Sequence, residues 1–122
     1  MLADWRTLAK DQGWSLDGDG FWVNVGNRRH RVSVVDVAGK VLLRSRVARR
    51  AILNAVAEPE LHAWQRNRVS ELVGFRIDRQ GVMVAETPLP SDVGRSEWTY
   101  LAFNLARAAD RFEYVLSGKD EE

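Results

Sequence analysis

Arginine is the residue type with the strongest chemical signal in this sequence. Residues 28–50 carry eight positive side chains against the single carboxylate of Asp36, although the net charge of the whole chain is only +1. Guanidinium groups bind phosphates and carboxylates through paired hydrogen bonds. We therefore expect partner or nucleic-acid binding by the arginines of this segment and one neighbouring aromatic side chain: Arg28, Arg29, Arg31, Arg44, Arg46, Arg49, Arg50 and Trp22.

Three interpretations of this basic segment remain open. Alternation along a strand places Arg29 and Arg31 on one face, and Arg44 and Arg46 on one face of the next strand. With Trp22 exposed beside them, such a face suits the phosphates and bases of a nucleic acid. It suits an acidic protein partner equally well. A solvated outer sheet face, whose long basic side chains discourage edge pairing, explains the same pattern without any ligand.

The other reactive residue types do not form a recognisable catalytic or metal pattern. His30 and His62 each lack a neighbouring His or Cys, whereas a metal site needs three or four converging ligands. Asp17 and Asp19 lie in an Asp-Gly turn, where acid–base catalysis would lack a rigid support. The chain has no cysteine, no phosphate-binding glycine loop and no nucleophile elbow around its serines. We therefore expect no enzyme, no cofactor and no metal, and we interpret the histidines as ordinary surface or partly buried side chains.

A long C-terminal helix is the element around which the rest of the chain is organised. Apolar residues recur every three or four positions over 96–116, which predicts one helix with a single buried stripe. Ser96 suits the N-cap and Glu97 the first turn, and Gly118 suits the end. The stripe consists of Trp98, Leu101, Ala102, Leu105, Ala108, Ala109, Phe112, Val115 and Leu116.

The remaining elements predict an α+β domain with a two-layer architecture. Short turns between consecutive strands require antiparallel pairing, so the strands form a five-stranded antiparallel sheet packed against the N- and C-terminal helices. We expect a single domain over 1–118 and an acidic tail over 119–122. The expected elements are a helix over 2–12, strands over 21–25, 29–37 and 41–46, helical segments over 48–56 and 59–70, and strands over 73–78 and 82–87.

Five tryptophans are many for a chain of 122 residues. Trp5 and Trp98 fall on apolar helix stripes and are expected in the core, whereas Trp14, Trp22 and Trp64 lie at element ends or on mixed faces. Exposed aromatic residues near arginine are typical of interfaces. We expect a dimer interface that includes Ile52, Val56, Trp64, Tyr100 and Phe103.

The chain resembles two related groups of proteins, over most of its length by the order of its elements and over about the last fifty residues by motif. The residues that carry the resemblance are Gly74-Phe75-Arg76-Ile77-Asp78-Arg79-Gln80-Gly81-Val82-Met83-Val84, with Asn67 before them and Leu89-Pro90, Ser96-Glu97, Leu101, Leu105, Ala109-Asp110-Arg111-Phe112 and Leu116 after them. The chain is similar to the YbjN-like bacterial proteins, described as sensory transduction regulators, and to the single-domain chaperones of type III secretion. Secretion chaperones are typically strongly acidic, so the basic middle of this chain favours the YbjN-like group.

The resemblance implies a fold of helix, three strands, helix, two strands and helix, and it implies a homodimer. The family has no agreed catalytic residues, so the resemblance also implies a binding module: a chaperone-like adaptor or a stress-response regulator. A small nucleic-acid-binding protein that uses the basic segment is the alternative. The N-terminus lacks the basic region followed by an apolar run that is typical of a signal peptide. No apolar run has the length that a membrane-spanning helix needs, so we expect a cytoplasmic protein.

Overall fold

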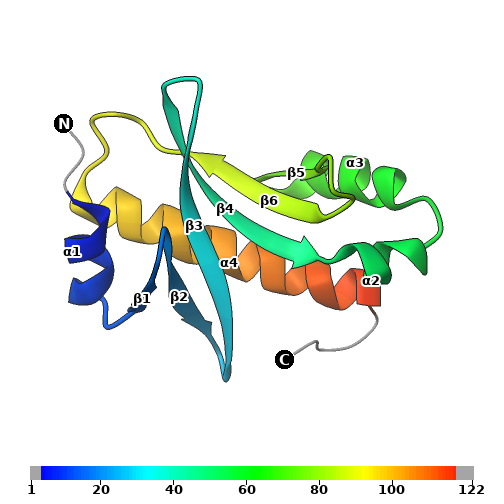
Figure 1. Cartoon of the computed structure of the whole chain (residues 1–122), viewed down its shortest axis with the longest axis horizontal. Helices are drawn as coiled ribbons and strands as arrows, with labels where there is room; N and C mark the ends of the chain where they lie inside the picture. Colours follow the sequence, from blue (N-terminus) through cyan, green and yellow to red (C-terminus); the bar gives the residue numbers. More distant parts are fainter. Residues whose placement is uncertain (1–3, 118–122) are drawn as a thin grey trace.

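One antiparallel sheet lies against a long C-terminal helix in the computed structural model, which describes residues 4–117 (Figure 1). The strand order across the sheet is β1-β2-β3-β4-β6-β5, and every neighbouring pair is antiparallel. The elements are α1 (Trp5–Asp11), β1 (Ser15–Asp17), β2 (Gly20–Val25), β3 (Arg28–Val37), β4 (Lys40–Ala48), α2 (Arg50–Asn54), α3 (Pro59–Val69), β5 (Gly74–Ile77), β6 (Met83–Pro88) and α4 (Arg95–Ser117).

The predicted α+β class and antiparallel sheet are confirmed, but the predicted number of strands is wrong. The sheet has a sixth strand, β1, in which Leu16 pairs with Phe21 across the turn that precedes β2. β1 has only three residues, which is too short to show the alternation that identifies a strand. The turn itself is where the Asp-Gly dipeptides predicted it, over residues 18 and 19.

The N-terminus of α4 also differs from the prediction. The helix begins at Arg95, and Gly94, rather than Ser96, accepts the first intrahelical hydrogen bond, from the Trp98 N–H at 2.9 Å. The Glu97 carboxylate accepts a hydrogen bond from the Gly94 N–H at 3.0 Å, so Glu97 caps the helix from its third position. Ser96 therefore lies inside the first turn. The predicted C-terminal glycine, Gly118, and the acidic tail lie outside the described residues.

Aromatic rings of α1, α4 and the sheet form the core between the two layers. The buried rings of Trp98 and Phe21 have centroids 5.3 Å apart, and Trp5 packs against Phe21 at 5.8 Å. Trp14, which we placed on a mixed face, stacks on Phe21 at 5.6 Å and packs against the core. It does so because the turn after α1 folds back over the sheet.

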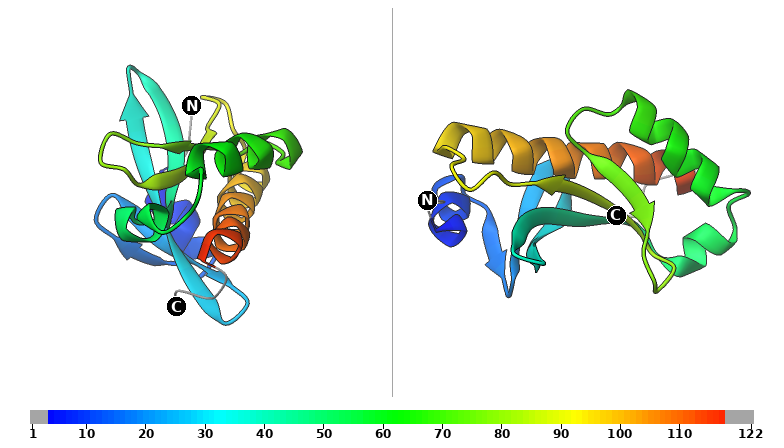
Figure 2. Two further views of the ribbon diagram at one scale, coloured as in Figure 1. Left: turned by 90° about the vertical axis from the view of Figure 1, so that its right-hand side faces the viewer. Right: turned by 90° about the horizontal axis from the view of Figure 1, so that it is seen from above.

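The helices are distributed unevenly around the sheet (Figure 2). α4 runs along one face and contacts β2, β3, β4 and β6, with α1 beside its N-terminal half. α3 lies at the opposite end, where it packs against the edge strand β5. Within residues 4–117, no helix is both long enough and apolar enough to cross a bilayer.

Candidate functional site

The arginines of the basic segment divide between the two faces of the sheet. On β4, Leu43, Ser45 and Val47 are buried beneath α4, whereas Arg44 and Arg46 alternate with them on the outer face. On β3, the buried residue His30 lies between Arg29 and Arg31. Arg28 lies two residues before His30 and therefore shares its face of the strand, so it reaches the inner side of the sheet, where it contacts α4. The outer face thus holds four of the predicted binding arginines, and Arg28 is not among them.

Carboxylates of the same chain bind two of the outer arginines. Arg31 contacts Asp17 at 3.2 Å and Asp19 at 2.7 Å, and both carboxylates come from the turn around residues 17–20. The hydrogen bond from Arg31 lowers the pKa of Asp19 despite some desolvation. The carboxylates of this turn therefore accept hydrogen bonds from the guanidinium group of Arg31. This arrangement neutralises charge that the sequence interpretation had assigned to a ligand.

Glu86 on β6 occupies the middle of a second outer network. Its carboxylate binds Arg44 of β4 at 2.5 Å and Arg76 of β5 at 3.0 Å, so one side chain connects three neighbouring strands. Burial alone would raise the pKa of Glu86, but the hydrogen bonds from Arg76 and Arg44 outweigh it and lower that pKa. Ionic pairing across three strands stabilises this sheet face.

The remaining predicted binding residues lie around these pairs. The guanidinium of Arg29 lies 4.7 Å from the ring centroid of Trp22, and the Trp22 indole N–H donates to Asp17 at 3.1 Å. Trp22 is consequently half-buried and covered on one face. Arg49 precedes α2, and Arg50 begins it and lies against Gly81 of the β5–β6 turn.

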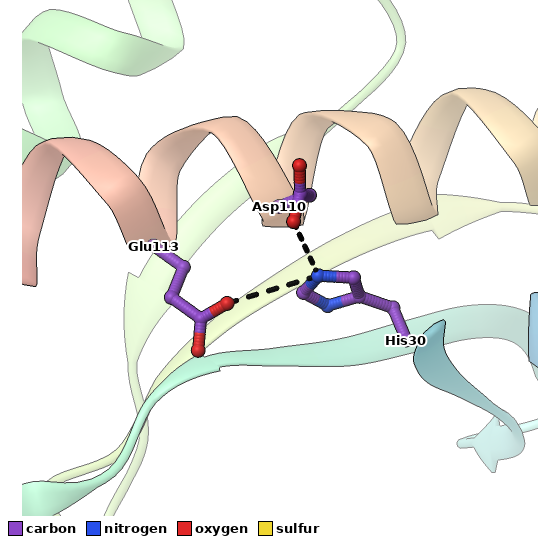
Figure 3. A group of neighbouring side chains, drawn as sticks. All are labelled: His30, Asp110 and Glu113. Atoms are coloured by element: carbon purple, nitrogen blue, oxygen red, sulfur yellow. Dashed lines mark hydrogen bonds and ion pairs between the residues drawn. The ribbon is translucent and has the colours of Figure 1, made fainter. Parts of the chain in front are cut away.

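A buried polar cluster connects β3 to α4, and the sequence interpretation did not find it (Figure 3). His30 Nε2 lies 2.9 Å from Asp110 Oδ1 and 3.7 Å from Glu113 Oε1, and all three side chains are buried. The Arg28 Nε donates to Asp110 Oδ1 at 2.7 Å, and a second nitrogen of Arg28 binds Oδ2. The hydrogen bond from Arg28 lowers the pKa of Asp110, and His30 acts in the same direction.

The cluster has the donor set of a metal site but not its electrostatics. His30, Asp110 and Glu113 offer ligand atoms that all lie within 4.8 Å of one another. However, both oxygens of Asp110 already accept hydrogen bonds from the Arg28 guanidinium. A cation would have to displace that positive group. Within residues 4–117, the cluster is therefore best described as an internal ion-pair network that fixes the C-terminal half of α4 on the sheet.

A faint sequence signal for this cluster existed. Asp110 and Glu113 are three residues apart and border the apolar stripe of α4 at Ala109 and Phe112, so both face the sheet. His30 shares the inner face of β3 with Val32. A carboxylate on a buried helix stripe requires a partner, and on the inner face of β3 the polar side chains that can donate to it are the guanidinium of Arg28 and the imidazole of His30.

The predicted dimer-interface residues occupy two kinds of environment. Ile52 and Val56, around α2, are partly buried against the chain's own core. Trp64, Tyr100 and Phe103 are exposed. Trp64 lies on α3, and the other two lie on the side of α4 that faces away from the sheet.

A groove separates α3 from α4. Its larger part has a volume of about 390 Å³ and is lined by Val69 of α3 together with Tyr100 and Arg107 of α4. A smaller part of about 170 Å³ continues along Val69 to Val115. The groove combines apolar and guanidinium groups and is formed by the two helices that carry the exposed aromatic residues.

Comparisons with known proteins agree with this architecture at the level of fold. No protein-family model and no curated protein sequence matches the chain. Among solved structures, it is similar to YbjN from E. coli, described as a candidate transcription regulator, with a TM-score of 0.58, 14% identity, and coverage of 93% of this chain and 87% of that chain. It is also similar to a chain of the ExsC–ExsE complex, with a TM-score of 0.55, 16% identity and coverage of 91% of each chain.

The chain has the fold shared by YbjN and the ExsC–ExsE complex. The resemblance noted in the sequence is thereby confirmed for the architecture, and the similarity of fold covers most of the chain, as the order of elements implied. At this level of identity it carries no residue of a site from those proteins to this one.

Proposed function

We propose that this chain is a non-enzymatic protein-binding module of the cytoplasm that works as a homodimer and serves as a chaperone-like adaptor or regulator. The fold comparisons support a binding role, because one similar chain comes from a complex of two proteins and the other is described as a regulator. The physical support comes from α3.

Two large apolar side chains of α3, Leu61 and Trp64, face away from the chain's own core, and this observation carries the proposal. The only buried apolar residue of the helix is the small Ala63. Asn67 attaches the helix to β5, because its side-chain amide exchanges two hydrogen bonds with the backbone of Phe75, at 2.7 and 3.0 Å. The large apolar residues point outward, with Leu61 44% and Trp64 56% exposed.

Such a helix gains little stability from its own chain. Short helices depend on tertiary burial of an apolar face, and an 11-residue helix that buries one alanine has little of it. Burying Leu61 and Trp64 against another chain would contribute about 1.5–3 kcal/mol for each fully buried side chain. A second copy of α3 offers the same apolar residues, as a twofold interface requires.

The outward side of α4 extends this surface. Tyr100, Phe103 and Tyr114 recur there with Arg107 and Arg111 at spacings of three and four. The Arg107 guanidinium lies 5.9 Å from the Phe103 ring centroid. Aromatic and arginine side chains are enriched at protein interfaces. We assign α3 to the contact between the two copies of the chain. We assign the outward stripe of α4, together with the α3–α4 groove, to the binding of a protein partner.

Molar mass measured by light scattering tests the dimer. The wild-type chain is expected at about 28 kDa, twice the 13.9 kDa of one chain. The double variant Leu61→Asp/Trp64→Asp is expected at the mass of one chain, because it places charge in the apolar contact. Val37→Asp alters an exposed apolar residue of the β3–β4 hairpin and serves as the control that remains dimeric. A wild-type mass of 13.9 kDa at high concentration, or a dimeric double variant, would contradict the assignment of α3.

Nucleic-acid binding by the basic segment has weaker support. Arg31 and Arg44 bind carboxylates of their own chain, and Arg28 binds α4. This alternative requires affinity that falls steeply as salt is raised. It also requires a large loss of affinity in Arg44→Ala/Arg46→Ala; an unchanged affinity would remove this face as the site.

A further inference from the structure

The sheet opens between two of its central strands. β3 pairs with β2 from Arg28 to Ser33, but it pairs with β4 only from Val32 to Val37. β4 continues to Ala48 along β6, with an irregular register between Arg46 and Ala48. The first residues of β3 and the last residues of β4 therefore diverge. We refer to the gap between residues 28–31 and 46–49 as the β3–β4 fork.

A small cavity of about 160 Å³ occupies this fork. Side chains from both sheet faces reach it, which a continuous sheet would not permit. Arginines surround it, and His30 and Glu113 of the buried cluster also line it. The arginines of the lining are Arg29, Arg31, Arg46 and Arg49.

The charge of the lining selects for an anion. Four arginines line the cavity, against the carboxylate of Glu113 in the lining and the carboxylates of Asp17 and Asp19, which pair with Arg31. Positive side chains at the fork therefore still outnumber carboxylates, by four to three. Metal ions are disfavoured by this excess of positive charge, although two of the three potential metal-ligating residues line the cavity.

Internal contacts hold Arg29 and Arg31 in place. Arg29 is stacked on Trp22. Arg31 is bound by Asp17 and Asp19 and also donates to Ser33 Oγ at 2.6 Å. Arginines whose rotamers are already fixed lose little conformational entropy on binding a ligand. Arg46, which is exposed near the C-terminal end of β4, is then the side chain that completes the contact.

We propose that the β3–β4 fork binds one phosphate group, either inorganic phosphate or the phosphate of a small phosphomonoester. The volume of the cavity is below the 300–1,000 Å³ of typical pockets for drug-sized ligands, so it admits one anionic group and not a whole nucleotide. A phosphate dianion has enough acceptor oxygens for several guanidinium groups, whereas one carboxylate has two oxygens. This site is separate from α3 and does not depend on the proposed dimer.

Calorimetric titration at constant ionic strength tests the site, because a fixed salt concentration removes general screening effects. Inorganic phosphate and glycerol 1-phosphate are the two probes, and acetate is the carboxylate control. The variant is Arg46→Gln, and Arg79→Gln is its matched control. Arg79 is an exposed arginine in the β5–β6 turn, outside the cavity, and its substitution changes the net charge equally.

Saturable binding of one phosphate per chain, weakened about tenfold or more in Arg46→Gln and unchanged in Arg79→Gln, is the expected result. Comparable affinity of the two probes identifies the phosphate group alone as the ligand, and binding of glycerol 1-phosphate only identifies a phosphomonoester. Equal affinity of Arg46→Gln and wild type would overturn the proposal, as would stronger binding of acetate or the absence of saturation with both phosphates. Melting temperatures without ligand establish that both variants are folded.

Discussion

The Asp110 carboxylate gives the most quantitative test of how β3 holds α4. Asp110→Asn keeps the size of the side chain but removes its charge and replaces one acceptor oxygen by an amide donor. In the wild type, Oδ1 accepts from Arg28 Nε at 2.7 Å and lies 2.9 Å from His30 Nε2, and Oδ2 binds Arg28 a second time. The substitution therefore weakens three contacts and places two donors against each other.

The expected cost is about 3 kcal/mol in the free energy of unfolding. Removing one partner of a buried ion pair typically costs about 3–5 kcal/mol, because the other charge remains buried. The rule applies to the pair of Arg28 with Asp110, but Arg28 is 25% exposed and regains some hydration. His30, which is 5% exposed, loses a hydrogen-bond partner that water cannot easily replace. We therefore expect the lower end of that range, which corresponds to a fall in melting temperature of about 10 °C for a domain of this size.

Urea denaturation at one fixed protein concentration measures this cost, because association would otherwise contribute to the apparent stability. Asp92→Asn, at an exposed position in the loop before α4, is the control and is expected to stay within about 0.5 kcal/mol of wild type. A cost below about 0.5 kcal/mol for Asp110→Asn would refute the reasoning, since it would mean that the buried network contributes nothing to stability.

The pH dependence of the same variant follows from the lowered pKa of Asp110. A carboxyl whose pKa is lower in the folded state binds protons more tightly when unfolded. Its contribution is complete above the ordinary aspartate pKa of about 3.9 and is lost as the pH falls below that value through the folded-state pKa. The stability difference between wild type and Asp110→Asn should therefore shrink as the pH falls below about 4. A difference that persists unchanged well below pH 4 would contradict the assignment.

Two further substitutions test other parts of the fold. Glu86→Gln removes the charge that binds Arg44 and Arg76, and we expect a loss of about 1 kcal/mol in urea denaturation, with part of the loss masked by solvent exposure of the arginines. Ala38→Gly should stabilise the chain by up to about 1 kcal/mol in the same assay, because Ala38 has a φ of 53° in the β3–β4 turn, which glycine adopts without strain. A destabilised Ala38→Gly variant would show that the turn does not carry this strain.

The sequence allowed the prediction of elements whose burial follows a regular period. The α4 stripe from Trp98 to Leu116 and the alternation on β4 are such patterns, because the physical cause of each is one buried face. Val115, which we included in the stripe, is an exception, because it is 47% exposed. β1 was missed because its three residues are too few to show a repeated two-residue alternation. The helix start at Arg95 was missed because Ser96 is a better cap by residue type, whereas the chain uses Gly94 with Glu97.

The site was harder to predict because it depends on contacts between distant segments. Arg28 was grouped with Arg29 and Arg31 by proximity in the sequence, yet strand alternation sends it to the opposite face, where Asp110 lies 82 residues away. His30 was interpreted without its carboxylate partners for the same reason. Sequence alternation identifies which side chains share a face. It does not identify which side chain of another element faces them, and the pairing of Arg31 with the acidic turn shows the same limit.

Hydrogen exchange of the α3 amides tests most directly whether this helix depends on another chain. The comparison is between wild type and Leu61→Asp/Trp64→Asp at the same concentration. We predict that amides over 61–69 are protected in the wild type and exchange much faster in the variant, while the buried stripe of α4 keeps its protection in both. Equal protection of α3 in the two proteins would show that its own chain stabilises it, and would contradict the proposal that its exposed Leu61 and Trp64 bind a second copy.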